Sequence, residues 1–147
     1  MDAIWIFYAW AGVKTELEGL ETDYFAFADL DSVFDFYTPV IIANNTFLAE
    51  EPETARAFLD AVSRGYEFAI EHPQEAGEIL CKAAPELDPD LVKASQEYLA
   101  DKYQADAPQW GYIDQERWDA YYAWLNEKGL TETPIEAGTG CSNEYLP

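Results

Sequence analysis

The feature that most constrains the fold of this chain is an unbroken apolar run close to its start. Residues 4–7 are isoleucine, tryptophan, isoleucine and phenylalanine, and β-branched and aromatic residues of this kind favour a β-strand. The run does not alternate with polar residues, which indicates a strand buried on both faces of a parallel sheet. The run therefore predicts an α/β fold.

A second apolar segment, residues 37–44, predicts another strand. Pro39 stands near its start, where no ladder donor is needed, and Asn44 begins a turn at its end. Residues 24–27 predict a further short strand. Strands this apolar need neighbours on both edges. We therefore expect the chain to begin inside a longer α/β protein and to form its C-terminal portion.

Helical patterns dominate the rest of the chain, so the fold is expected to be helix-rich. Apolar residues recur at helical spacing after Pro52, after Pro73 and after Pro89, and proline favours the first helical position. Asp114 is typical of a helix N-cap, and Gly129 of a helix end. The predicted helices cover residues 11–20, 52–71, 73–84, 89–104 and 115–128, and the tail from Thr131 onward is predicted to be extended.

The charge balance excludes one class of partner. The chain has 29 acidic and 8 basic residues, a formal net charge of -21. Such a chain repels phosphate backbones, so we expect no nucleic-acid partner, and anionic membrane surfaces are disfavoured for the same reason. No apolar run is long enough to predict a transmembrane helix, and no basic segment precedes the first strand as in a signal peptide.

Aromatic side chains are the candidate binding residues. Tyr8 and Trp10 follow the first predicted strand, at the end where open α/β sheets bind ligands. Aromatic rings with polar tips can clamp a flat organic molecule. Tyr37, at the start of the second strand, is the third candidate. The alternative interpretation is that these rings are core residues, and that interpretation is favoured for the helical aromatics Trp118, Tyr121 and Tyr122.

The residue types and their spacing give little indication of a catalytic or metal-binding site. His72 is the one histidine, and no CxxC, HExxH or EF-hand spacing occurs. The acidic residues Asp29, Asp31 and Asp35 are interpreted as a solvated loop rather than a calcium site. Cys81 and Cys141 either form one disulfide or remain free thiols. We predict no catalytic residue, no metal site and no cofactor.

Short segments in a fixed order also resemble a known family. The likeness covers nearly the whole chain and is to the substrate-binding proteins of ABC importers, in the branch that binds thiamine pyrimidine precursors and is related to alkanesulfonate- and nitrate-binding proteins. Each segment is weakly specific by itself, but their order and spacing together are more specific. They are the Tyr-x-Trp turn after Asp2-Ala3, Tyr37-Thr38-Pro39-Val40-Ile41-Ile42, Glu51-Pro52-Glu53, Ala57-Phe58-Leu59, Gly65-Tyr66, Glu71-His72-Pro73-Gln74-Glu75-Ala76, Trp110-Gly111-Tyr112-Ile113-Asp114, Arg117-Trp118 and Ser142-Asn143-Glu144-Tyr145-Leu146-Pro147.

The resemblance implies a type II periplasmic-binding fold, in which two lobes close on a ligand and signal to a membrane permease. Residues 1–36 would end the second lobe, and residues 37–147 would return to the first. The N-terminal half would be missing from this chain. The full-length protein would be periplasmic or extracellular and associated with the membrane. Relatives often carry an acidic residue beside the turn tryptophan, whereas Trp10 is followed by Ala11, Gly12 and Val13.

The resemblance thus implies a non-enzymatic solute-binding protein for a small aromatic or pyrimidine-type thiamine precursor, or a similar nitrogen or sulfur compound. An enzyme on the same fold that makes the thiamine pyrimidine is the alternative. It would need its reactive histidine or lysine and its metal site in the missing half. A third alternative is an interaction module that uses the acidic surface.

Overall fold

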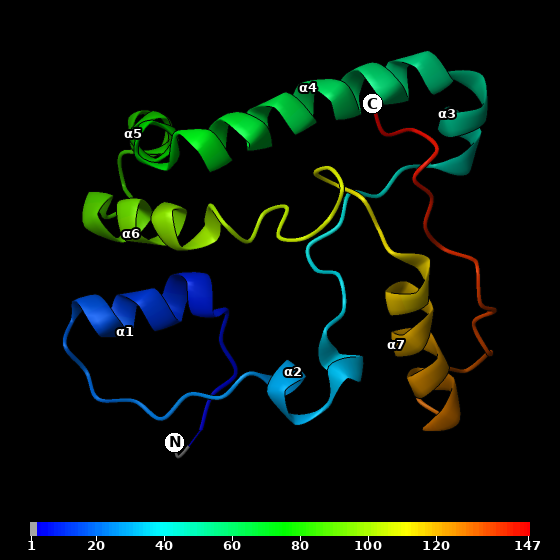
Figure 1. Cartoon of the computed structure of the whole chain (residues 1–147), viewed down its shortest axis with the longest axis horizontal. Helices are drawn as coiled ribbons and strands as arrows, with labels where there is room; N and C mark the ends of the chain where they lie inside the picture. Colours follow the sequence, from blue (N-terminus) through cyan, green and yellow to red (C-terminus); the bar gives the residue numbers. More distant parts are fainter. Residues whose placement is uncertain (1–2) are drawn as a thin grey trace. The chain divides into compact units, whose positions relative to one another are not determined.

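The structure is a computed structural model, and it describes residues 3–147. Figure 1 shows a chain of helices joined by long irregular segments. In order they are the π-helical turn η1 (Tyr8–Gly12), α1 (Val13–Leu17), α2 (Phe27–Leu30), the 3₁₀ turn η2 (Ser32–Phe34), α3 (Asn45–Glu50), α4 (Pro52–Glu71), α5 (Pro73–Ala83), α6 (Pro89–Leu99) and α7 (Gln115–Glu127).

The helices that prolines and caps predict are confirmed. α4 and α5 begin at Pro52 and Pro73, and Asp88 caps α6 by accepting a hydrogen bond from the Asp90 N–H at 3.0 Å. The Asp114 carboxylate caps α7 in the same way, accepting from the Arg117 N–H at 2.8 Å. These helix starts depend on the proline and the capping side chain at each position, so they can be predicted from the sequence.

The predicted strands are not formed. Within residues 3–147 the structure has no strand, so the helix-rich part of the fold prediction is confirmed and the α/β part is not. Residues 4–7 are irregular, residues 24–26 lead into α2, and residues 37–44 run without regular structure. Their apolar side chains are largely exposed, Ile42 by 88%. A strand exists only with a partner that completes its hydrogen bonds, and these segments have none in the described part of the chain.

Two helix predictions need correction, and one helix was not expected. The helix expected at residues 11–20 begins earlier, as η1, and α1 ends at Leu17 before the positive φ of Gly19. α6 ends at Leu99 rather than near Gln104. α3 was not predicted. The Asn44 side chain, assigned to a turn, accepts from the Thr46 N–H at 2.8 Å and so caps that helix.

The chain divides into two compact units. The first contains the residues up to Asp23 together with Ala61–Trp110. In it α5 packs against α6, and η1 and α1 also contact α6. Its buried apolar side chains are those of Val13, Leu91, Val92 and Trp110.

The second unit contains Tyr24–Asp60 and Gly111–Pro147. Its irregular tail is held to α7 by side chains. Asn126 binds both backbone groups of Ile135, and Asp119 accepts from the Gly138 N–H at 3.0 Å. The two units do not follow the division between residues 36 and 37. The assignment of residues 1–36 and 37–147 to two lobes stays a prediction.

Candidate functional site

Six residues of the second unit line a small cavity, which we call the aromatic pocket. Its volume is about 190 Å³, and it is lined by Phe36, Tyr37, Thr38, Trp118, Tyr121 and Tyr122. Five of these six side chains are aromatic and none is charged. Pockets for drug-sized ligands span about 300–1,000 Å³. The aromatic pocket is smaller, which suits a single ring.

The wall on α7 follows from helix geometry. Trp118, Tyr121 and Tyr122 are spaced three and four residues apart, so the cap at Asp114 sets them on one face. The ring of Phe36 stacks on Tyr121 with centroids 4.3 Å apart and an interplanar angle of 23°. Trp118 and Tyr122 are in ring contact at 5.2 Å. The pocket is therefore built where the segment after η2 meets one face of α7.

Tyr37 is positioned by two contacts from the start of α7. Its hydroxyl oxygen accepts a hydrogen bond from the Asp114 N–H at 2.9 Å. The Arg117 guanidinium lies over its ring, with the central carbon 4.3 Å from the centroid. Arg117 also donates from Nε to the Asp35 carbonyl at 2.6 Å and forms an ion pair with the Asp35 carboxylate. The first turn of α7 thus fixes both the tip and the face of Tyr37.

The C-terminal tail positions Trp118. The indole Nε1–H donates to the Thr139 carbonyl at 3.0 Å. Gly140 has φ +85°, and a Cβ built on it would lie 3.4 Å from the Trp118 Nε1, so a residue with a side chain would be strained and crowded. The polar edge of this tryptophan is therefore satisfied by backbone.

Of the six residues that line the aromatic pocket, Tyr37 alone was predicted to bind a ligand. Trp118, Tyr121 and Tyr122 were assigned to a core, and they line the cavity while remaining partly exposed. Their residue types could have indicated this. Three aromatic residues with polar tips on one helix face are unusual for a closed core, where Leu, Ile and Val dominate. The binding role of Tyr37 stays a prediction.

Tyr8 and Trp10 lie in the first unit, on η1 rather than at the end of a strand. The Tyr8 ring contacts Tyr98 with centroids 5.3 Å apart, and its hydroxyl donates to the Glu16 carboxylate. Trp10 is 40% exposed. Val13, three residues after Trp10, is buried. Tyr8 thus packs within its unit, whereas Trp10 presents ring surface to solvent.

Gly12 permits the position of the Tyr8 ring. A Cβ at Gly12 would lie 2.5 Å from Tyr8 Cδ2, whereas a Cβ at Gly65 of α4 meets no atom within 4 Å. We expect Gly12→Ala to lower the free energy of unfolding by about 1–2 kcal/mol, because overpacking outweighs the helix propensity gained. Gly65→Ala should instead raise it by about 0.5–1 kcal/mol. Urea denaturation measures the change in the free energy of unfolding for both variants, which should be of opposite sign. A stabilising Gly12→Ala would contradict the packing described.

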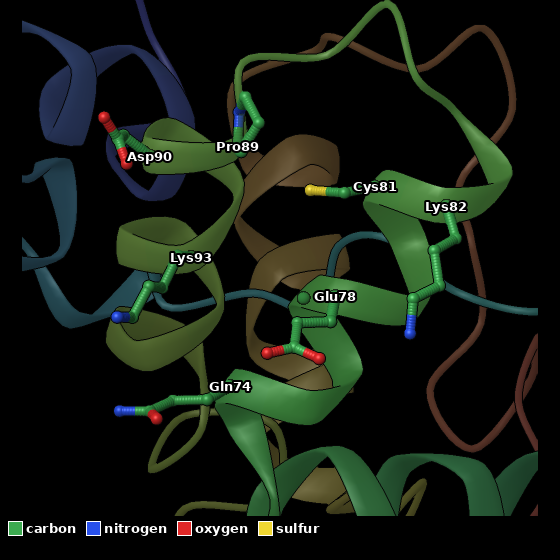
Figure 2. A pocket seen from close by; sticks show the side chains of 8 residues that line it. Gln74, Glu78, Cys81, Lys82, Pro89, Asp90 and Lys93 are labelled. Atoms are coloured by element: carbon green, nitrogen blue, oxygen red, sulfur yellow. The ribbon is translucent and has the colours of Figure 1, made fainter.

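A second cavity, of about 420 Å³, lies in the first unit between α5 and α6. Figure 2 shows Cys81 pointing from α5 toward the start of α6, near Pro89. The other lining residues are Gln74, Gly77, Glu78, Lys82, Asp90 and Lys93. Two carboxylates and two ammonium groups balance, and none of the eight is aromatic. This cavity offers no surface for stacking a flat ring.

The thiols of Cys81 and Cys141 are the next candidate reactive groups. Cys81 and Cys141 are free thiols in the structure. Burial raises the pKa of the Cys141 thiol, although its hydrogen bond to Gln115 opposes this. A raised pKa disfavours the thiolate that nucleophilic chemistry requires.

The aspartates that the sequence places close together have partners within the second unit. Asp31 caps η2, and Asp35 pairs with Arg117. Among residues 3–147, no three histidine, cysteine or acidic side chains are grouped to hold a metal ion, and no helix is long and apolar enough to cross a membrane.

Comparison with known proteins identifies the family. The family model described as "NMT1/THI5 like" matches residues 1–76, just over half of the chain. The chain belongs to the NMT1/THI5-like family. The resemblance to the substrate-binding proteins of this family is therefore confirmed.

Three curated relatives match the chain. A formylaminopyrimidine-binding protein from Halalkalibacterium halodurans is 29% identical over 82% of the chain and 37% of its own length. A riboflavin-binding protein from Chloroflexus aurantiacus is 24% identical over 92% of the chain and 39% of its length. A 4-amino-5-hydroxymethyl-2-methylpyrimidine phosphate synthase from Candida albicans is 36% identical over 76% of the chain and 31% of its length. The chain thus spans well under half the length of these relatives.

Proposed function

We propose that this chain is part of a solute-binding component of an ABC importer, and that the ligand is a small pyrimidine-type thiamine precursor. Membership of the NMT1/THI5-like family carries the proposal, together with two relatives that are named as binding proteins for a formylaminopyrimidine and for riboflavin. The complete protein would hold its ligand in a cleft between two lobes and deliver it to a membrane permease outside the cytoplasm. Its N-terminal half would supply the neighbours that the exposed apolar segments need.

The aromatic pocket supports a pyrimidine rather than a larger ring system. Its lining includes the aromatic side chains of Tyr37, Trp118 and Tyr121, in a volume of about 190 Å³. That volume suits one heteroaromatic ring better than the three fused rings of riboflavin. Stacking supplies contact area, and the hydroxyl groups of Tyr37, Thr38 and the α7 tyrosines can orient ring nitrogens. Tyr8 and Trp10, on η1 of the first unit, are also proposed as ligand-binding residues.

Calorimetry on the complete protein that contains this chain tests the proposal. 4-Amino-5-hydroxymethyl-2-methylpyrimidine, its formylamino analogue, riboflavin and an alkanesulfonate are the probes. We expect the pyrimidines to bind at micromolar concentrations. Tyr37→Ala should weaken them about tenfold to hundredfold, since truncating an aromatic contact costs about 1.5–3 kcal/mol. Tyr37→Phe is the matched control, because it keeps the ring and removes only the hydroxyl, and its loss should be smaller.

The outcomes separate the parts of the proposal. If no pyrimidine binds below millimolar concentration, the assigned ligand class is wrong. If Tyr37→Ala binds as well as the unaltered protein, the aromatic pocket is not the site. If Trp10→Ala leaves affinity unchanged, the η1 turn does not contribute to the cleft.

The second candidate function is the enzyme that makes the thiamine pyrimidine. The name of the Candida albicans relative, 36% identical to this chain, favours it. A turnover assay on the complete protein with pyridoxal phosphate and iron distinguishes the two functions. Formation of a pyrimidine phosphate would establish the enzyme, whereas reversible pyrimidine binding without product would support the binding protein.

A further inference from the structure

Arg117 stands beside the aromatic pocket without lining it. Its guanidinium lies over the ring of Tyr37 at 4.3 Å, yet only Tyr37 of the two residues borders the cavity. One face of this ring is therefore covered by a cation, and a ligand reaches only the part of the ring that the guanidinium leaves open.

The guanidinium is held in this place by two contacts with Asp35. Nε donates to the Asp35 carbonyl at 2.6 Å, and a terminal nitrogen pairs with the Asp35 carboxylate. The backbone of Arg117 is fixed separately, because its N–H donates to the Asp114 cap at 2.8 Å. A planar guanidinium fixed by a backbone carbonyl and a carboxylate has little freedom to leave the ring. The covered face of Tyr37 is thus a lasting feature of the unit.

Without Arg117 the pocket would favour organic cations. Aromatic walls attract ammonium and pyridinium-type groups through the negative faces of their rings. The six lining residues carry no charge of their own, and the chain as a whole has a net charge of -21. Both features would draw a cation. A guanidinium already seated on Tyr37 uses the attraction of that ring and repels a second positive charge on its other side.

We propose that Arg117 determines the charge specificity of the aromatic pocket, so that the pocket accepts neutral flat heteroaromatic rings and rejects cationic rings of the same shape. The proposal rests on the proposed function of the pocket as a ring-binding site. Asp35 is the positioning residue in this arrangement, since it contacts the guanidinium and not the cavity.

The test compares two probes that differ in charge. They are 4-amino-2-methylpyrimidine, in alkaline buffer where it is uncharged, and its ring-N-methylated pyrimidinium salt. Calorimetry on the complete protein gives the ratio of the two dissociation constants. We expect the neutral ring to bind about tenfold more tightly than the cation, because the positive charge of Arg117 on the other face of Tyr37 repels a like charge.

Two matched substitutions separate charge from structure. Arg117→Gln removes the charge and should lower the ratio about tenfold, whereas Arg117→Lys keeps the charge and should preserve most of the ratio. If Arg117→Gln weakens both probes equally, Arg117 is only structural and the inference is overturned. If the unaltered protein binds both probes but prefers the cation, the inference is also overturned while the ring-binding site stands.

A further variant keeps the test decisive if Arg117→Gln does not fold. Arg117→Met also removes the charge and keeps a long, unbranched side chain at this position. The preference for the neutral ring should then fall about tenfold, and an unchanged preference would overturn the inference. If neither probe binds the unaltered protein, the proposed function fails and this inference fails with it.

Discussion

Replacing Trp110 with alanine is expected to lower the free energy of unfolding of this chain by about 3–5 kcal/mol, the cost of truncating a buried tryptophan. Trp110 is only 9% exposed, and its ring stacks on Tyr66 with centroids 4.4 Å apart and an interplanar angle of 18°. Tyr66 in turn contacts the ring of Tyr103 at 4.9 Å. Removing the indole would leave a void beside Tyr66.

Urea denaturation followed by circular dichroism measures this loss, and Trp5→Ala is the matched control. Trp5 is 63% exposed and contacts only Phe7 among the described ring pairs, at 4.5 Å. Its removal should change the free energy of unfolding by no more than about 0.5 kcal/mol, as for most exposed positions. Equal losses for the two tryptophans would contradict the burial described for Trp110.

Replacing Asn126 with alanine is expected to cost about 2–3 kcal/mol and to release the C-terminal tail. The Asn126 amide donates to the Ile135 carbonyl at 2.8 Å, and its oxygen accepts from the Ile135 N–H and the Thr131 hydroxyl, each at 3.0 Å. Each hydrogen bond contributes about 0.5–1.5 kcal/mol, and the groups left behind are partly buried. The tail has no regular structure of its own, so it depends on such contacts.

Urea denaturation measures the loss of stability, and limited proteolysis of residues 131–147 reports the release of the tail. Cleavage in this segment should become faster in Asn126→Ala. Asn45→Ala is the control, because Asn45 is exposed at the start of α3 and its removal should change the free energy of unfolding by no more than about 0.5 kcal/mol. Unchanged cleavage of the tail in Asn126→Ala would show that other contacts hold it.

The helices of this protein were more predictable than its apolar segments. Pro52, Pro73 and Asp88-Pro89 mark helix starts through their own covalent and hydrogen-bonding chemistry, and the structure places helices there. A strand depends on a partner that the sequence does not specify. Residues 4–7 and 37–44 therefore carry strand propensity without forming strands, and their side chains remain exposed.

The residues of the aromatic pocket were also predictable only in part. Tyr37 was predicted as an aromatic residue at the start of an expected strand, whereas the three aromatic residues of α7 were assigned to a core and instead line the cavity. Periodicity shows that Trp118, Tyr121 and Tyr122 share a face. It does not show whether that face is filled by other side chains or borders a cavity.

The sequence by itself determined where helices begin, the acidic character of the chain and its family. These properties depend on residue types and on contacts between near neighbours. Only the tertiary structure decided that Arg117 covers Tyr37, that Trp118 is bound by the tail and that Tyr8 packs on Gly12 and Tyr98. The first two contacts join residues tens of positions apart or across a loop, and local propensity carries no information about such distances. The third depends on the absence of one Cβ atom and on a ring from a distant helix.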